Sequence, residues 1–337
     1  MYQAQQIVGS FRLIALLGRG GVAEVWKAEH TSLGSLHAVK FLSVHTENLS
    51  ERLLLEGRVQ ATLGHPNVVR VTDVVAERER IGLVMELIQG PTLERWIHAL
   101  WKMELVEDLF RGICGGVRAA HAAGLVHRDL KPQNVLLATI DGVLVPKVTD
   151  FGIARAMEET QGTRTGSLLG TLRFMSPEQL RDASRVDARS DIWALGCVLY
   201  EMVTRKPFVP DLDVVTLYER HRAGGFVPLS EAAPEAPENL VRVVGACLRF
   251  DPSERPANVD GVLAILDGGA HRTSVTGAGG PTLGDLALDV QGGGRGDVSA
   301  WRASRPNGEF ALVKVVSAGA GSDTLARFEN EARLGAN

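Results

Sequence analysis

Cysteine is scarce in this sequence, and long apolar runs are absent. The chain of 337 residues has three cysteines, Cys114, Cys197 and Cys247, which lie far apart and show no metal-ligand spacing. This excludes a disulfide framework and predicts a reducing, cytoplasmic location. No stretch approaches the roughly 18 consecutive apolar residues of a membrane span, and residues 1–12 lack the basic start and apolar run of a signal peptide. We therefore expect no membrane span.

Excess charge of either sign is also lacking. Lys plus Arg number 36 against 40 for Asp plus Glu, which gives a net charge of −4. Because that balance is a poor electrostatic match for a polyanion, we expect no nucleic-acid partner. Hydrophobic residues make up 45% and charged residues 23%, which is enough apolar surface to bury a core and excludes disorder as the main state.

The hydrophobic pattern divides the chain into a strand-rich part followed by a helix-rich part. Alternation at period two predicts strands at 11–17, 22–29, 36–42, 68–75 and 81–87. Helical spacing predicts helices at 47–63, 92–101 and 105–123, with short strands after them at 135–138 and 143–149. This order favours an α+β fold with two lobes.

Residues 268–283 have the composition of a flexible linker, which would join a domain at 11–267 to a last segment at 284–337. That segment repeats the start of the chain. Residues 308–314 (GEFALVK) match 34–40 (GSLHAVK) without a gap, and the matches before and after them keep the same spacing to within one residue. An accidental glycine-rich tail is the alternative.

Two features of the strand-rich part fit phosphate chemistry. Gly18 and Gly20 lie between two predicted strands, where glycines let backbone N–H groups approach phosphate oxygens closely. A plain hairpin turn is the alternative. Lys40 lies on an apolar strand, and a buried lysine needs an anionic partner, which Glu56 on the following helix can supply. The alternative is a surface lysine with an unrelated glutamate.

The helix-rich part carries a more specific set of motifs. His127-Arg128-Asp129-Leu130-Lys131-Pro132-Gln133-Asn134 is followed, after a short hairpin, by Asp150-Phe151-Gly152. Further motifs follow in order at 176–178 (SPE), 191–196 (DIWALG) and 251–256 (DPSERP). With these motifs, nearly all of residues 11–267 resembles the protein kinase family. The motif sequences are most similar to those of bacterial serine/threonine kinases of the Hanks type. The resemblance implies a bilobal fold, with a small β-rich lobe containing one main helix and a larger helical lobe.

The resemblance also implies a role for each motif residue, with ATP and Mg²⁺ as cofactors. Lys40 would hold the α- and β-phosphates, and Glu56 would orient Lys40. Asp129 would accept the proton of the substrate hydroxyl, and Lys131 would neutralise charge near the transferred phosphate. The predicted metal ligands are Asn134 and Asp150. The predicted adenine and phosphate contacts are Leu17, Gly18, Gly20, Val25, Ala38, Met85, Glu86, Ile88 and Leu136.

Lys131 bears on the substrate class, because kinases with lysine at this position usually act on serine or threonine. Thr171, before the 176–178 motif, agrees with that assignment. We therefore predict a general protein serine/threonine kinase whose partners are protein substrates with Ser or Thr acceptors. A nucleotide-binding, pseudokinase-like scaffold that presents the carboxyl-terminal segment to a partner is the alternative, and the intact Lys40, Asp129 and Asp150 argue against it. A small-molecule phosphotransferase is a further alternative.

The resemblance also points to regulation by phosphate. Arg128 would be buried near Asp129 and would need a counter-anion, and Arg155 would be a second clamp. Related bacterial kinases autophosphorylate at positions that correspond to Thr163 and Thr165, in a homodimer if the reaction occurs in trans. A merely hydrophilic loop is the alternative.

Two more expectations follow from the resemblance. Glu178 and Arg255 would form a buried ion pair with a structural role. Residues 284–337 would be the start of a second kinase-like lobe, with Lys314 and Glu331 in the paired roles. Whether that copy is truncated, degenerate or docked on the first domain stays open.

Overall fold

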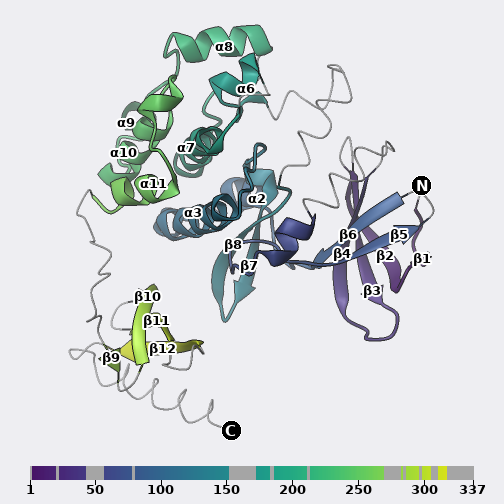
Figure 1. Cartoon of the computed structure of the whole chain (residues 1–337). Helices are drawn as coiled ribbons and strands as arrows, with labels where there is room; N and C mark the ends of the chain where they lie inside the picture. The colour runs from purple at the N-terminus through teal and green to yellow at the C-terminus, as the bar shows by residue number, and fades with distance from the viewer. Residues whose placement is uncertain are drawn as a thin grey trace. The chain divides into compact units, whose positions relative to one another are not determined.

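The computed structural model describes residues 2–19, 23–42, 57–77, 80–151, 172–182, 186–210 and 213–268, and the backbone of four strands between 282 and 316. The chain forms two compact units, Met1–Gly269 and Ala270–Asn337. Figure 1 shows the first unit as a sheet-rich lobe followed by a helical lobe. The α+β, bilobal architecture predicted for this region is confirmed.

The smaller lobe is a six-stranded antiparallel sheet in the order β1-β2-β3-β4-β6-β5. Its core is apolar and includes Phe11, Leu13, Trp26, Val39 and Phe41. The strands are β1 (Ile7–Val8), β2 (Phe11–Arg19), β3 (Ala23–His30), β4 (Leu36–Leu42), β5 (Val71–Glu77) and β6 (Arg80–Glu86). Residues 57–62 are helical, and the rest of the helix predicted at 47–63 lies mostly outside the described residues.

Several strand boundaries differ from the prediction, and pairing between segments explains two of them. β2 continues through Gly18 to Arg19, because Arg19 pairs with Glu24 on β3 and its Nε lies 3.1 Å from Glu24 Oε1. Two register shifts, between Leu13 and Ala15 and between Leu16 and Gly18, bend this strand. The strand predicted from residue 68 begins only at Val71, because Val68 forms an isolated bridge with Val148 of the other lobe.

The larger lobe is built around one buried helix. All residues from Ser190 to Val203 of α7 are buried, so this helix is covered on every side. The helices of this lobe are α2 (Leu93–Ala99), α3 (Val106–Ala122), α6 (Pro177–Arg181), α7 (Ala188–Thr204), α8 (Val214–Arg222), α9 (Leu229–Ala232), α10 (Glu238–Cys247) and α11 (Val259–Leu266). Single 3-10 turns lie at Met103–Leu105, Pro132–Asn134 and Pro252–Glu254. None of the described helices is long and apolar enough to cross a membrane.

A hairpin of β7 (Val135–Ile140) and β8 (Val143–Val148) packs against α3 and carries the candidate site at its ends. Gly112 and Gly116 of α3 allow the close approach. A Cβ at Gly112 would lie 2.5 Å from Pro146 Cγ, and one at Gly116 would lie 3.2 Å from Val148 Cγ2. The loop before β7 contains Asp129, and Asp150 follows β8, so the hairpin holds both segments.

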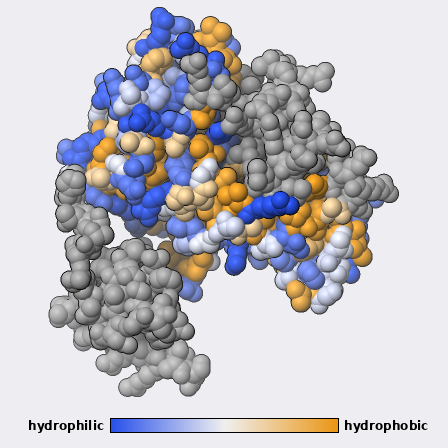
Figure 2. All heavy atoms as spheres, in the orientation of Figure 1, coloured by the Kyte–Doolittle hydropathy of each residue, from blue (hydrophilic) through white to orange (hydrophobic). Residues whose placement is uncertain are grey.

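The surface of the first unit mixes polar and apolar side chains. On the face in Figure 2, apolar side chains are interrupted by hydrophilic ones. Among the described residues, the three most exposed large apolar side chains are Leu33 (76% exposed), Val215 (72%) and Val143 (62%), and they lie in separate parts of the fold. Single exposed apolar side chains of this kind are common on protein surfaces and mark no binding site by themselves.

The second unit contains a four-stranded antiparallel sheet in the order β12-β11-β10-β9. Its strands are β9 (Thr282–Leu283), β10 (Leu286–Arg295), β11 (Val298–Ser304) and β12 (Phe310–Val316). β9 takes up the last two residues of the segment predicted as a linker, and most of that segment lies outside the described residues.

The register of this second sheet repeats that of the first. Leu288 pairs with Ala303 as Leu13 pairs with Ala28, and Ala300 pairs with Lys314 as Val25 pairs with Lys40. β10 also has two register shifts, between Leu288 and Val290 and between Gln291 and Gly293, at the positions that match the shifts in β2. The repeat seen in the sequence is therefore also a repeat of strand pairing.

Candidate active site

A lysine of the sheet lobe and a carboxylate of the helical lobe meet at the centre of the first unit. Lys40 Nζ on β4 lies 2.7 Å from Asp150 Oδ1, and the lysine is buried. Burial raises the pKa of the Asp150 carboxyl, but the charge and hydrogen bond of Lys40 outweigh this effect and hold that pKa below its usual value. Asp150 is therefore an anion at neutral pH, next to a fixed cation.

The loop before β7 holds the carboxylate predicted to act as the base. Lys131 Nζ lies 3.0 and 2.8 Å from the two carboxylate oxygens of Asp129. The side-chain amide of Asn134 donates to the main-chain oxygen of Asp129 at 2.8 Å and to Asp129 Oδ2 at 3.1 Å. Three of the predicted catalytic residues thus meet at one place, and an ammonium and an amide orient the carboxylate.

A buried carboxylate on α7 holds the backbone that leads to Asp129. Asp191 accepts from the N–H of His127 at 2.8 Å and from the N–H of Arg128 at 2.8 Å, and its Oδ2 lies 2.7 Å from His121 Nε2. Arg128 has a φ of +66°, a left-handed conformation that costs a non-glycine residue about 1–3 kcal/mol. The bonds from Asp191 help to stabilise this strained turn.

The structure corrects one expectation for this turn. Arg128 was expected to be buried, but the residue is only partly buried. The main chain of Arg128 makes the contacts with the helical lobe: its N–H donates to Asp191, and its carbonyl oxygen accepts from Gln179 at 2.8 Å.

Most of the predicted adenine contacts lie in one apolar cluster. Ala38 on β4 and Met85 on β6 are buried register partners. Leu17 is 52% exposed, and a Cβ added at Gly18 would meet nothing within 4 Å. The cluster contains Ala38, Val69, Val71 and Met85, with Val25, Leu87, Ile88 and Leu136 packed against it.

One polar contact beside this cluster was not found from the sequence. Lys147 Nζ on β8 lies 2.7 Å from Glu86 Oε1, at the end of β6, and the same oxygen accepts from the N–H of Arg70 at 2.9 Å. Lys147 is buried and Glu86 is partly exposed. The only sequence signal was a lysine inside a short apolar strand, and the partner of that lysine depends on how two distant strands meet.

The predicted ion pair between Glu178 and Arg255 is confirmed. Arg255 Nη1 and Nη2 lie 2.7 and 2.8 Å from the two carboxylate oxygens of Glu178, and Ser190 Oγ donates to Glu178 Oε1 at 2.7 Å. Burial raises the pKa of Glu178, but the hydrogen bonds and charge of Arg255 outweigh it and leave that pKa below its usual value. This pair joins α6 to the segment before α11.

Several predicted residues lie outside the described part of the chain. They are Gly20, Glu56, Arg155, Thr163, Thr165 and Thr171. The roles predicted for them, including the pairing of Glu56 with Lys40, stay predictions.

The residues that are described fit ATP and Mg²⁺. Mg²⁺ takes oxygen ligands and is commonly bound by one or two carboxylates together with substrate phosphates. Asp150 offers a carboxylate, and Asn134, whose amide nitrogen bonds Asp129, offers an amide oxygen. Bound Mg²⁺ would neutralise phosphate charge there.

Comparisons with known proteins agree with this geometry. The family model described as protein kinase domain matches residues 11–264. The serine/threonine-protein kinase Pkn1 of Myxococcus xanthus is 36% identical over 257 residues, which cover 74% of this chain and 37% of Pkn1. The serine/threonine-protein kinase PkaA of Streptomyces coelicolor is 32% identical over 327 residues, which cover 91% of this chain and 59% of PkaA. The probable serine/threonine-protein kinase PknB of Lactococcus lactis is 37% identical over 258 residues, which cover 74% of this chain and 40% of PknB.

The chain belongs to the protein kinase family. It spans 37%, 59% and 40% of the three relatives just named.

Proposed function

We propose that this chain is an ATP-dependent protein kinase that transfers the γ-phosphoryl group of MgATP to serine and threonine hydroxyls. Two linked polar clusters carry the proposal, because the N–H of Thr149, next to Asp150, donates to the main-chain oxygen of Asn134 at 3.0 Å. Lys40 bonds Asp150, and Asp129 bonds both Lys131 and Asn134. Phosphoryl transfer depends on positioning and on neutralising charge, with little covalent chemistry for the protein to perform. Two fixed cations and two carboxylates at the junction of the lobes supply these requirements.

Each described residue would have a distinct task in this reaction. Lys40 binds phosphate oxygens, and Asp150 and Asn134 provide the oxygen ligands for Mg²⁺. Asp129 takes up the proton of the acceptor hydroxyl on its carboxylate, and Lys131 stabilises the charge beside it. Glu56, outside the described residues, would orient Lys40.

The acceptor class is the finer part of the proposal. Lys131 supports serine and threonine as acceptors, and so do the names of Pkn1, PkaA and PknB. The test incubates the full chain with MgATP and unstructured protein substrates and identifies the phosphorylated residues by mass spectrometry, with Asp129→Asn as the control. Phosphoserine and phosphothreonine in the wild-type reaction alone are expected. Transfer to tyrosine alone would contradict the acceptor class.

Regulation by the segment that contains Thr163 and Thr165 also belongs to this proposal. Phosphate on these threonines would bond to Arg128 and Arg155 through charge-assisted bonds of roughly 1.5–3 kcal/mol each. The partly buried position of Arg128, next to Asp129, supports a link between that phosphate and the base. A Thr163→Ala/Thr165→Ala chain should have a reduced kcat, and an undiminished kcat would contradict the link. If one copy of the chain phosphorylates another, the initial rate of autophosphorylation should rise with the square of the enzyme concentration.

The second unit is proposed as the start of another kinase-like lobe, joined by a linker to the domain at 11–267. The repeated register supports this, because Lys314 on β12 holds the position that Lys40 holds on β4. Paired cysteines test the register: Trp301→Cys/Val313→Cys should form a disulfide, because these residues face each other across β11 and β12. Preferential disulfide formation in Trp301→Cys/Lys314→Cys would contradict this register, since a shift of one residue turns a side chain to the other face of the sheet.

A cytoplasmic location stays a prediction, supported by three buried free thiols.

A further inference from the structure

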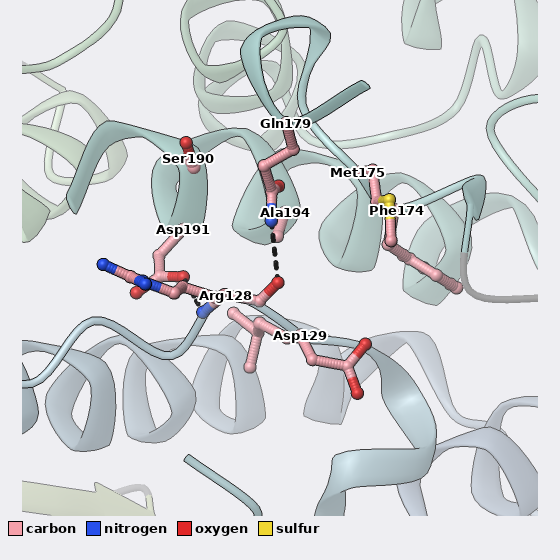
Figure 3. Close-up of a pocket in the computed structure, with 9 residues that line it drawn as sticks. Arg128, Asp129, Phe174, Met175, Gln179, Ser190, Asp191 and Ala194 are labelled. Atoms are coloured by element: carbon pink, nitrogen blue, oxygen red, sulfur yellow. Dashed lines mark hydrogen bonds between the residues drawn. The ribbon is translucent and has the colours of Figure 1, made fainter. Parts of the chain in front are cut away.

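A glutamine of α6 reaches from its own helix to the turn that carries the candidate base. Gln179 Nε2 donates to the main-chain oxygen of Arg128 at 2.8 Å, across 51 residues of sequence. Figure 3 shows the Gln179 amide pointing at Arg128, with Asp191 bonded to the N–H of the same residue. The kinase motifs did not single out this glutamine, and nothing in the predicted chemistry uses it.

The other end of the Gln179 amide is also occupied. Gln179 Oε1 accepts from the N–H of Ser176 at 3.0 Å and lies 3.1 Å from Ser176 Oγ. Ser176 and Gln179 together form the capping box of α6. Ordinary capping needs only this oxygen. The amide nitrogen is left to make the contact with Arg128, so one side chain joins the start of α6 to the catalytic loop.

The contact falls on a peptide group with a special position. The carbonyl of Arg128 belongs to the planar peptide bond that leads into Asp129, and the direction of the Asp129 Cα–Cβ bond depends on the orientation of that plane together with the φ of Asp129. Arg128 itself has a φ of +66°, a conformation that persists only when the surroundings hold it. Asp191 holds the N–H of Arg128 and Gln179 holds its carbonyl. Without Gln179, the carbonyl side of this strained turn loses this bond.

We propose that Gln179 is a positioning residue for the proposed base: by donating to the Arg128 carbonyl, it fixes the direction of the Asp129 carboxylate and couples that direction to the placement of α6. The inference rests on the proposed kinase activity in its catalytic part. Its structural part concerns the order of the loop and can be measured on any folded chain.

The substitution Gln179→Glu isolates the contact. A glutamate keeps an oxygen for Ser176 but replaces the donor that faces the Arg128 carbonyl with an acceptor. A roughly ten- to hundredfold fall in kcat is expected at pH 8, with the KM for ATP unchanged, because misplacing a reacting group costs rate and leaves nucleotide binding intact. The ratio of the variant's kcat to that of the wild type should rise as pH falls from 8 to 5.5, since a protonated carboxyl can donate again.

Two control variants separate positioning from other effects. Ser176→Ala weakens the cap of α6 but leaves the Gln179–Arg128 bond, so it should lower Tm and reduce kcat less than Gln179→Glu does. Gln3→Glu, at an exposed position near the amino terminus, introduces the same charge without touching the loop. The pH-dependent recovery should appear in Gln179→Glu and in neither control.

Hydrogen exchange supplies a readout that needs no activity. The amides of His127, Arg128 and Asp129 should exchange faster in Gln179→Glu than in Ser176→Ala, at a pH where both chains are folded. Unchanged exchange in Gln179→Glu would overturn the inference even if the chain transferred no phosphate. In an active chain, wild-type kcat in Gln179→Glu, or a loss that matches Ser176→Ala at every pH, would also overturn it.

Discussion

Lys40 and Asp150 form a 2.7 Å ion pair between the two lobes of the first unit. The lysine comes from β4, an inner strand of the sheet, and the aspartate follows β8 of the helical lobe. The side chain of Lys40 is 7% exposed and that of Asp150 is 31% exposed, so the lysine depends on this carboxylate more than the carboxylate depends on the lysine. One bond thus brings two motifs, 110 residues apart in the sequence numbering, into the same site.

Removal of Lys40 should greatly slow the reaction without unfolding the chain. Lys40→Met should lower kcat by about a hundredfold or more, because it removes a fixed cation from the place where phosphate charge must be stabilised. Lys102→Met, at an exposed position between α2 and α3, is the matched control and should leave kcat within twofold. Steady-state phosphorylation rates and circular dichroism measure both effects. If Lys40→Met kept more than a tenth of the activity, the role of Lys40 would be wrong.

Disruption of the pair between Glu178 and Arg255 should destabilise the fold. The Arg255 side chain is fully buried and also donates to the main-chain oxygens of Arg249, Phe250 and Arg189. Arg255→Met should therefore cost about 3–5 kcal/mol of unfolding free energy, and more than Glu178→Gln, because it strands a carboxylate and three carbonyls. Urea unfolding at pH 7 gives both values. A loss of unfolding free energy in Arg255→Met equal to or smaller than that in Glu178→Gln would contradict this structural role of Arg255.

The same pair predicts a pH dependence. The folded pKa of Glu178 is below its usual value, so the unfolded chain binds the proton more readily. The stabilisation is full above the unfolded pKa of about 4.3 and is lost as pH falls through the lower folded pKa. The difference in stability between the wild type and Glu178→Gln should narrow below about pH 4. A difference that stayed constant from pH 7 to pH 3 would contradict the assignment.

His221 on α8 should make the protein less stable in mild acid. Its side chain is buried against Trp193 and Phe208, and neither ring nitrogen has a hydrogen-bond partner among the described residues. Burial, together with the charges of Arg255 and Arg220, lowers the pKa of His221 to about 4. Because the unfolded histidine titrates near 6.5, the wild type should lose roughly 2 kcal/mol between pH 7 and pH 5 from this residue.

His221→Phe tests that expectation by keeping an aromatic ring without a titrating group. Its unfolding free energy should fall by roughly 2 kcal/mol less than that of the wild type between pH 7 and pH 5. Parallel stability curves for the two chains would show that His221 is not the cause.

The bond between Lys147 and Glu86 should affect nucleotide affinity. Glu86 lies at the end of β6, where the backbone is predicted to face adenine, and Lys147 fixes its carboxylate at 2.7 Å. Lys147→Met should raise the KM for ATP about three- to tenfold, a fraction of the roughly 1.5–3 kcal/mol of a charge-assisted bond, and change kcat less. Lys206→Met, at an exposed position, is the control. An equal change in KM in both variants would contradict the assignment.

The sequence predicts the elements of this fold better than their meeting points. The strand at 36–42 and the helix at 105–123 match β4 and α3 to within about a residue at each end, because their hydrophobic periods are regular. β2 runs past the predicted break, because pairing of Arg19 with Glu24 outweighs the local signal of the glycines. Such a pairing is a property of two strands and is not visible in either one.

The site shows the same division. Motifs whose spacing can be recognised in the sequence contain Asp129, Lys131, Asn134 and Asp150. In the structure, Asp129 contacts Lys131 and Asn134, and Asp150 contacts Lys40. Lys147 and Gln179 could not be found in that way. Each lies within an ordinary short element and acquires its partner, Glu86 or Arg128, only when elements 61 or 51 residues away in sequence come together.

Asp129 is proposed to act as the base in phosphoryl transfer from ATP to protein. The most direct measurement compares the full wild-type chain with Asp129→Asn in MgATP, recording both phosphate transfer to a protein substrate and the Kd for ATP. We expect transfer by the wild type, a fall in kcat of about 10²–10⁴-fold in Asp129→Asn, and the same Kd for ATP in both chains. Tight binding of ATP with equal rates of transfer in the two chains, or with none in either, would contradict it.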